Sequence, residues 1–332
     1  MVLTERETKM SSKKIIIDTD PGVGIPGTDA DDPIALLFAL ADKRLDLLAV
    51  TSTFGNCPPW LTARGAKKVL QAAGRDDIPV AQGIPLPLGG VLPQELQEAY
   101  KGPRGKVGKI DLPELEKGSS SIAPEQIIKT VHQYPHEVTV VAIGPQTNVA
   151  AALLIDPSIA DEIKEIVFMG GGLGINPTYG KGNVTPVAEC NIYFDPIAAN
   201  IVFSSGIPMR MVSLDVTNPE TGVILRDDAI KAIPADKSPA NALFAEICAT
   251  YMEKPMFDWG DGCVLYDPLA VLAAADPEVG TYESMSVKVE TKGQYTLGET
   301  VPDKQSAPNM QVMTDVDGAA AIAEIVKTIE TL

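Results

Sequence analysis

One stretch near the start of the chain restricts the fold more than any other, because it joins an apolar strand to an apolar helix through an acidic loop. The strand is centred on Ile15–Ile17, and the helical pattern begins at Pro33. Five aspartates lie between them, within fifteen residues: Asp18, Asp20, Asp29, Asp31 and Asp32. Carboxylates this close repel one another unless a cation lies among them, and oxygen ligands suit a hard ion such as Ca²⁺ or Mg²⁺.

The spacing of these aspartates predicts a shared site. Asp18 and Asp20 are two residues apart at the end of a strand, so their side chains point to the same face. Asp31 and Asp32 stand at the start of a helix, where free N–H groups and the helix dipole stabilise anions. Helix capping and a solvated loop would account for one or two of the five, so we interpret the loop as a metal or catalytic centre.

Strand and helix patterns alternate through most of the chain, which is typical of an α/β fold with a mainly parallel open sheet and helices on both faces. The expected strands are Lys14–Asp18, Leu45–Thr53, Val138–Ile143, Glu165–Met169 and Met209–Leu214. The expected helices are Pro33–Ala41, Leu61–Ala73, Pro124–His132, Asn148–Leu154 and Asp195–Ser205.

The end of the chain has a different pattern. Ser284–Glu290 and Gln294–Val301 predict a small C-terminal β-hairpin, and a closing helix is expected from Asp315. Without repeats or low-complexity linkers, we expect a polar tail over residues 1–13 and a single domain over residues 14–332.

Composition excludes several classes of partner. The formal net charge of −17 argues against binding to nucleic acid or to an anionic membrane. No apolar stretch is long enough to span a bilayer, and the first residues lack a secretory signal. The four cysteines form no C-x-x-C pair, so we expect free thiols and a cytoplasmic location.

Blocks along the whole chain resemble the nucleoside hydrolase family. Its Asp-Thr-Asp-Pro-Gly-x-Asp-Asp motif corresponds to Asp18–Gly22 and Asp31-Asp32, with eight residues (Val23 to Ala30) where the family usually has one. The other matching blocks follow in the family's order: Phe54-Gly55-Asn56, Gly144–Ala150, Met169–Gly172, Gly182-Asn183, Ala188–Asn191, Asp195-Pro196 and Tyr266–Ala270.

The resemblance implies a nucleoside hydrolase-like fold and a Ca²⁺-dependent ribonucleoside hydrolase, usually a homodimer or homotetramer. Its ion would be held by Asp20, Asp32, Asp267 and the backbone carbonyl of Ile143. Asp20 would also take a proton from the metal-bound water, and Asp18 would orient the ligands around it. The ribose hydroxyls would be held by Asp31, Asn56, Asn183, Glu189 and Asn191.

This chemistry agrees with the residue types. Cleavage of an N-glycosidic bond passes through an oxocarbenium-like state, which carboxylates stabilise. Asparagine offers a donor and an acceptor to each sugar hydroxyl. Asn183 and Asn191 would serve equally well as turn or cap residues if Glu189 did not lie between them.

The place of the leaving-group acid departs from the family. Members that favour inosine and uridine commonly carry His before the last Asp, where this chain has Tyr266. The only histidines are His132 and His136, in a segment expected at the surface. Tyr266 either donates a proton or, with Trp259 and Phe257, stacks against the base. We expect a preference for purine ribonucleosides.

Two other interpretations remain open at this stage. A haloacid-dehalogenase-like Mg²⁺ phosphatase also begins with Asp-x-Asp after a strand, although Asp261 and Asp267 are too widely spaced for its second motif. A non-catalytic nucleoside- or ribose-binding protein would explain the missing histidine. The insertion of Val23 to Ala30 adds Asp29. From the sequence alone, Asp29 and Asp31 could exchange roles.

Overall fold

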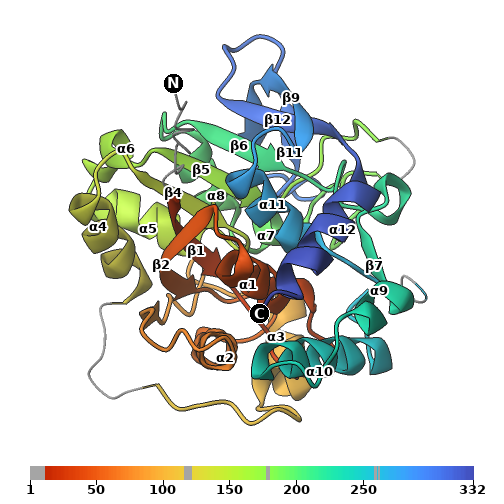
Figure 1. Ribbon diagram of the computed structural model, residues 1–332. Helices are drawn as coiled ribbons and strands as arrows, with labels where there is room; N and C mark the ends of the chain where they lie inside the picture. The colour runs from red at the N-terminus through yellow and green to blue at the C-terminus, as the bar shows by residue number, and fades with distance from the viewer. Residues whose placement is uncertain (1–11, 116–121, 177–179, 258–259, 261) are drawn as a thin grey trace, which may run out of the picture.

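An eight-stranded sheet forms the centre of the molecule (Figure 1). The structure, a computed structural model, describes residues 12–115, 122–176, 180–257, 260 and 262–332. Seven strands are parallel and one edge strand, β9, is antiparallel. In spatial order the strands are β3 (Val80–Ala81), β2 (Leu45–Ser52), β1 (Lys13–Thr19), β4 (Val138–Ala142), β5 (Glu165–Met169), β6 (Met209–Val212), β12 (Met310–Val316) and β9 (Gly280–Met285).

Helices cover both faces of this sheet, which confirms the predicted α/β architecture. One layer packs on a core that includes Ile15 and Ile17; it contains α1 (Asp31–Ala41), α2 (Pro59–Ala72), α10 (Pro239–Glu253), α11 (Tyr266–Ala275) and α12 (Gly318–Ile329). The other layer packs on a core that includes Ile16; it contains α4 (Ala123–Gln133), α5 (Thr147–Ile155) and α8 (Pro196–Phe203). Figure 1 shows α4 and α5 beside one another, away from α10 and α12.

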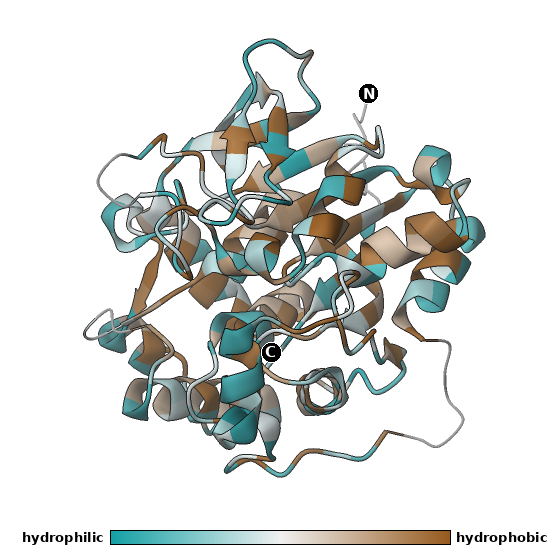
Figure 2. Ribbon diagram, turned by 180° about the vertical axis from the view of Figure 1, so that it is seen from behind, coloured by the Kyte–Doolittle hydropathy of each residue, from teal (hydrophilic) through white to brown (hydrophobic). Residues whose placement is uncertain are grey.

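The position of β1 follows from its sequence. Successive side chains of a strand point to opposite faces, so three consecutive isoleucines reach both helical layers. All three are fully buried, and β1 pairs with β2 on one side and β4 on the other. The strand therefore brings Asp18 and Asp20 to the middle of the sheet. In Figure 2, hydrophobic ribbon likewise runs through the interior, whereas hydrophilic ribbon lies mainly on outer helices and loops.

The C-terminal region differs partly from expectation. The predicted hairpin is present as β10 (Val287–Val289) and β11 (Thr300–Pro302), which are antiparallel and shorter than predicted. Asp315, however, lies in β12, and the closing helix begins at Gly318 with Asp317 as its cap. The predicted closing helix is therefore present, but its start was placed three residues too early, because pairing with distant strands holds Met310–Val316 as a strand.

Smaller elements complete the chain. They are α3 (Gln94–Lys101), η1 (Pro103–Gly105), α6 (Ile159–Glu162), α7 (Cys190–Phe194), η2 (Pro219–Thr221), β7 (Ile224–Arg226), α9 (Asp227–Ala232) and β8 (Gly262–Val264). β7 pairs with β8 in a two-stranded antiparallel sheet. The predicted N-terminal tail lies almost wholly outside the described residues.

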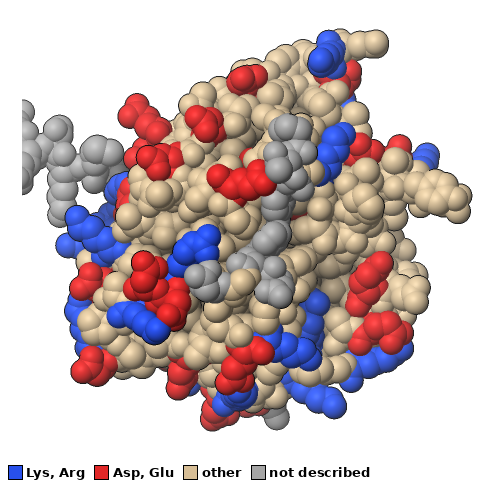
Figure 3. Space-filling view, turned by 90° about the vertical axis from the view of Figure 1, so that its right-hand side faces the viewer, with Lys and Arg blue, Asp and Glu red and all other residues tan. Residues whose placement is uncertain are grey.

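Surface charge, the cysteines and the length of the helices complete the description. Acidic and basic side chains are interspersed over the face shown in Figure 3. All four cysteines are free, as predicted. Among the described residues, no helix has the length and apolar character needed to cross a bilayer.

Candidate functional site

A polar pocket opens at the carboxyl ends of β1, β2, β4 and β5, where ligands bind in open α/β sheets. The hollow encloses about 420 Å³, including the solvent at its mouth. Its lining contains twelve of the residues singled out in the sequence: Asp20, Asp29, Asp31, Asp32, Asn56, Ile143, Asn183, Glu189, Asn191, Phe257, Tyr266 and Asp267. Met169, Cys190, Phe194 and Met256 complete it.

Asp20 is fixed between two glycines that leave no room for a side chain. A Cβ at Gly55 would lie 2.3 Å from Asp20 Oδ2, and one at Gly144 would lie 2.4 Å from Asp20 Oδ1. The backbone N–H of Asn56 donates to Asp20 Oδ2 at 2.6 Å. The Gly-Asn and Gly-Pro turns of the sequence therefore serve to enclose this carboxylate from both sides.

Three carboxylates from two helices meet beside Asp20. Asp31, Asp32 and Asp267 each place an oxygen within 4.8 Å of the others, and all three are buried. Asp31 and Asp32 occupy the first turn of α1 and Asp267 the first turn of α11, where helix dipoles favour negative charge. The backbone N–H of Asp267 donates to Asp31 Oδ2 at 3.2 Å, which joins the two helix ends.

This group differs in one member from the ion ligands implied by the family resemblance. Asp31 belongs to the close group, whereas Asp20 lies at the same pocket outside it. Asp32 already has several donors: Thr19 Oγ1 at 2.5 Å and the backbone N–H of Asp20 at 2.9 Å reach its Oδ1. Asn56 Nδ2 reaches its Oδ2 at 2.8 Å.

The raised pKa values of the buried aspartates indicate that the pocket would be stabilised by a cation. Burial, followed by the charges of neighbouring aspartates, raises the pKa of Asp31 and Asp267 well above the ordinary value. Burial and the charge of Asp32 do the same for Asp20. For Asp32, burial raises the pKa to about 6 against the effect of its hydrogen bonds. Buried carboxylates stay charged only when paired with a cation, and an all-oxygen set fits a hard one.

The Gly55–Asn56 turn is held by residues that the sequence analysis missed. Arg104 Nε donates to the Asn56 carbonyl at 2.6 Å, and its Nη2 donates to the Gly55 carbonyl at 2.6 Å. The Tyr100 hydroxyl donates to the Gly55 carbonyl at 3.1 Å and accepts from its N–H at 3.0 Å. Arg104 lies in a Gly- and Pro-rich segment without regular pattern, so only the tertiary structure shows this role.

The opposite wall comes from the segment around α7. Glu189 caps this helix and accepts three backbone N–H groups, those of Asn191, Ile192 and Gly171, at 2.8 to 3.1 Å. Burial raises its pKa to about 6, while these bonds oppose the shift. Asn183 Oδ1 accepts from the Cys190 N–H at 2.9 Å.

Ile143 lines the pocket, and its carbonyl already has a polar neighbour. Asn191 Nδ2 donates to it at 3.2 Å. The Ile143 N–H donates to the backbone carbonyl of Asp18 at 2.8 Å, so β1 positions this residue directly.

Asp18 does not line the pocket. Its Oδ1 accepts from Thr51 Oγ1 at 2.6 Å and from Asn148 Nδ2 at 2.9 Å, whereas the buried Oδ2 has no partner among the described residues. Burial raises the pKa of Asp18 to about 7. Asp18 ties β1 to β2 and α5 beneath the site.

Aromatic side chains form the remaining side of the pocket. The rings of Phe257 and Tyr266 meet edge to face, with centroids 6.5 Å apart. Trp259 lies outside the described residues. His132 is exposed and bonded to Asp156 and Glu162, and His136 is exposed as well. Neither histidine lines the pocket.

Comparison with known proteins agrees with this geometry. The sequence profile of the inosine-uridine preferring nucleoside hydrolase family matches residues 15–323. The chain belongs to the nucleoside hydrolase family. It is therefore a hydrolase of N-glycosyl bonds, and the phosphatase interpretation is excluded.

Relatives of this nucleoside hydrolase carry names that point to different bases. A pyrimidine-specific ribonucleoside hydrolase of Citrobacter koseri is 38% identical, over 91% of this chain and 93% of that protein. Uridine nucleosidase 1 of Arabidopsis thaliana is 36% identical over 88% of this chain and 82% of that one. The purine-preferring ribonucleoside hydrolase of Gardnerella vaginalis has a TM-score of 0.80 at 31% identity, covering 96% of this chain and 98% of that one. A plant nucleoside hydrolase has a TM-score of 0.81 at 31% identity, covering 96% and 99%.

Proposed function

We propose that this nucleoside hydrolase is Ca²⁺-dependent and cleaves ribonucleosides to ribose and free base, with Asp20 as the general base. The buried group of Asp31, Asp32 and Asp267 beside Asp20 carries the proposal. Four carboxylates that burial and mutual repulsion make costly to ionise need a divalent ion, and they lie in a pocket whose other polar groups suit a sugar.

Asp20, Asp32, Asp267 and the Ile143 carbonyl would hold the ion. When bound, Ca²⁺ would orient the ribose diol and make water more acidic. Asp31, which belongs to the close group of carboxylates, would accept a hydrogen bond from a ribose hydroxyl, and Asn56 would also bind the ribose hydroxyls. Asn183, Glu189 and Asn191 would hold the other hydroxyls from the opposite wall.

The chemistry assigned to Asp20 follows from its surroundings. Gly55 and Gly144 enclose the carboxylate, and the Asn56 N–H fixes one of its oxygens. A base held in this way loses little freedom when it takes a proton from the attacking water. Its partners in the pocket stabilise the cationic sugar of the transition state.

The preferred base is the finer part of the proposal. Phe257 and Tyr266 offer ring edges and faces to a departing base, and no imidazole reaches the pocket to protonate it. A purine is more easily protonated by solvent than uracil, so we propose that purine ribonucleosides are preferred among neutral nucleosides. The names of the pyrimidine-specific relatives instead favour a preference for pyrimidine nucleosides, and the ribose-release assay measures this preference directly.

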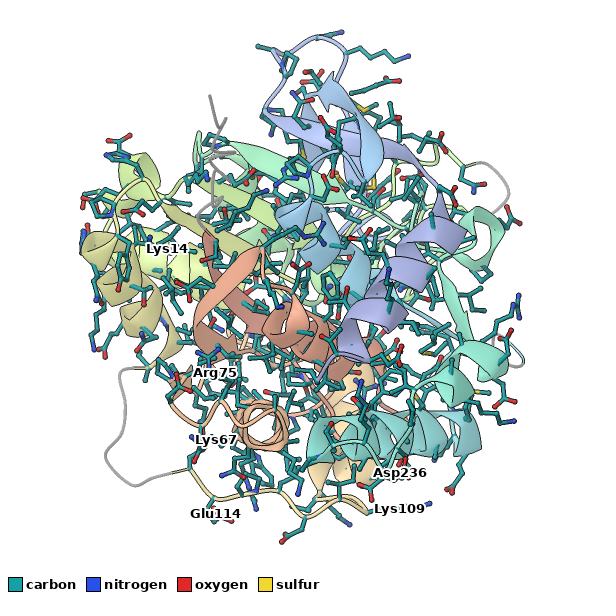
Figure 4. All side chains as sticks on the ribbon, in the orientation of Figure 1. Lys14, Lys67, Arg75, Lys109, Glu114 and Asp236 are labelled. Atoms are coloured by element: carbon teal, nitrogen blue, oxygen red, sulfur yellow. The ribbon has the colours of Figure 1, made fainter. Side chains whose placement is uncertain are left out.

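Release of ribose from inosine, guanosine, adenosine, uridine and cytidine tests this function. We expect Asp20→Ala to lower kcat about 10³-fold or more, because the general base and one side of the ion site are removed together. Asp236→Ala is the matched control, because this aspartate (labelled in Figure 4) is exposed and does not line the pocket. Wild-type activity in Asp20→Ala would refute the mechanism.

Removal of the ion tests the ligand set. The chelated wild-type enzyme should lose activity and regain it with Ca²⁺. Calorimetric titration with Ca²⁺ should show weaker binding for Asp267→Asn than for the wild type. Nucleoside binding without any release of ribose over hours would instead indicate a binding protein.

A further inference from the structure

The insertion between Val23 and Ala30 brings an additional carboxylate into the pocket. Asp29 lines the pocket and is 7% exposed. Its Oδ1 accepts from the backbone N–H of Ala30 at 2.9 Å. Its Oδ2 makes no hydrogen bond within the described part of the chain, and this atom is not completely buried. One acceptor of a nearly buried carboxylate is therefore available to a ligand.

The insertion is built to hold Asp29 in place. Thr28 Oγ1 donates to the carbonyls of Gly22 and Ile25 at 2.7 and 2.8 Å, which closes the loop on itself. The Asp29 N–H donates to Asn56 Oδ1 at 2.9 Å, so the carboxylate stands beside a residue of the pocket.

The loop is also anchored from outside. The Gly27 N–H donates to the Lys254 carbonyl at 3.2 Å, and the Lys109 N–H donates to the Gly24 carbonyl at 3.0 Å. Lys109 and Glu253 form an ion pair across these two segments (Lys109 is marked in Figure 4). A carboxylate held by this many contacts is preorganised for binding.

The pocket has a large excess of negative charge. Six carboxylates line it: Asp20, Asp29, Asp31, Asp32, Glu189 and Asp267. Its described lining contains no Lys, Arg or His. Arg104 lies near enough to lower the pKa of Asp20 and Asp29, but its guanidinium bonds to the carbonyls of Gly55 and Asn56 behind the lining. One divalent ion would leave much of this charge unbalanced.

Asp29 lines the same pocket as the aromatic side chains of Phe257 and Tyr266. The Tyr251 hydroxyl donates to the Phe257 carbonyl at 2.9 Å and so holds the backbone that carries the Phe257 ring. This ring packs edge to face against Tyr266. Aromatic rings beside a carboxylate form a favourable environment for an organic cation.

We propose that the preferred substrates of this enzyme are ribosides whose base carries a permanent positive charge, such as N-ribosylpyridinium compounds, and that Asp29 confers this preference. The proposal rests on the proposed N-glycoside hydrolysis. It explains together the extra carboxylate, the aromatic wall and a pocket without histidine, because a cationic base needs no acid to leave.

The reaction balances without proton transfer to the base. The bond from C1′ to the ring nitrogen breaks, and its electron pair neutralises the positive nitrogen. A water oxygen bonds to C1′, and the proton it loses passes to the carboxylates and then to solvent. The products are ribose, a neutral pyridine and one proton. The same active site would cleave a neutral nucleoside more slowly, because its base leaves as an anion unless solvent protonates it.

Comparison of nicotinamide riboside with inosine and uridine tests the proposal. We expect the wild-type, Ca²⁺-loaded enzyme to give a kcat/KM for nicotinamide riboside at least tenfold above either neutral nucleoside. In Asp29→Asn, which preserves the shape of the side chain, this ratio should fall at least tenfold. Asp236→Asn removes an equal charge at an exposed residue outside the pocket lining and should keep the wild-type ratio.

A second measurement on the wild type covers the case in which Asp29→Asn does not fold. Added NaCl should lower kcat/KM for the cationic substrate more than for inosine, because salt screens attraction to a charged pocket. An unchanged ratio in folded Asp29→Asn, or neutral nucleosides cleaved as fast as the cation, would overturn this inference alone. Cleavage of neither kind of substrate would overturn the proposed function as well.

Discussion

Substitution of Gly144 by Ala offers a sharp test of how the fold positions Asp20. The added methyl carbon would lie 2.4 Å from Asp20 Oδ1 and 2.5 Å from Thr53 Cγ2. Ordinary contact begins at 3.4 Å, so the carboxylate must move by about 1 Å. Gly144 does not have a positive φ, so the change introduces a steric clash without the backbone strain that alanine would meet at Gly55.

The expected magnitude follows from that displacement. A misplacement of about 1 Å in a catalytic group costs about 100-fold in rate, which corresponds to about 2.7 kcal/mol. Overpacking of a buried site should also lower the free energy of unfolding by about 1–3 kcal/mol. We therefore expect Gly144→Ala to fold, to melt at a lower temperature, and to lose about 100-fold in kcat/KM.

The assay is ribose release at saturating Ca²⁺, together with urea unfolding of each variant. Gly89→Ala is the control, because the nearest atom to its Cβ, Ile197 Cδ1, would be at 3.6 Å and its φ is not positive. This control should keep wild-type activity. A folded Gly144→Ala enzyme within threefold of the wild-type kcat/KM would refute the assignment of Asp20 as a closely held base.

Two further substitutions examine the support of the site. Arg104→Ala removes both guanidinium donors to the Gly55–Asn56 turn. It should reduce kcat/KM for ribose release about tenfold or more, since hydrogen bonds from charged donors contribute about 1.5–3 kcal/mol. The control Lys101→Ala, at an exposed residue, should leave kcat/KM unchanged in the same assay. Burial raises the pKa of Asp18 from 3.8 to about 7, so the wild type binds a proton more tightly when folded and loses stability as pH rises through 7. Asp18→Asn lacks that loss, and Ca²⁺-free urea unfolding should favour it by up to about 4 kcal/mol at pH 8 but little at pH 4; parallel pH profiles would contradict this reasoning.

Local sequence was sufficient for the elements that carry the site. The three isoleucines of β1 can be buried only in a strand covered on both faces, and the aspartates after them must then lie at its carboxyl end. The strand Glu165–Met169 was predicted with its observed bounds for the same reason. By contrast, Met310–Val316 is a strand because β6 and β9 lie on either side of it, and no local pattern encodes that pairing.

The same division applies to the site itself. Asp20, Asn56 and Asp267 could be assigned to one site because their motifs resemble those of the nucleoside hydrolase family and follow in the same order. Arg104 and Tyr100 could not, because their hydrogen bonds join segments about fifty residues apart in the sequence.

The acidic loop between Asp18 and Asp32 shows this difference most clearly. Its sequence determined that carboxylates would gather where a strand meets a helix, because strand period and helix dipole act over a few residues. Only the tertiary structure decided which of them meet: Asp267 arrives from α11, Asp18 turns beneath the pocket, and a buried insertion carries Asp29 into it. Those placements depend on packing between distant segments, which no short stretch of sequence specifies.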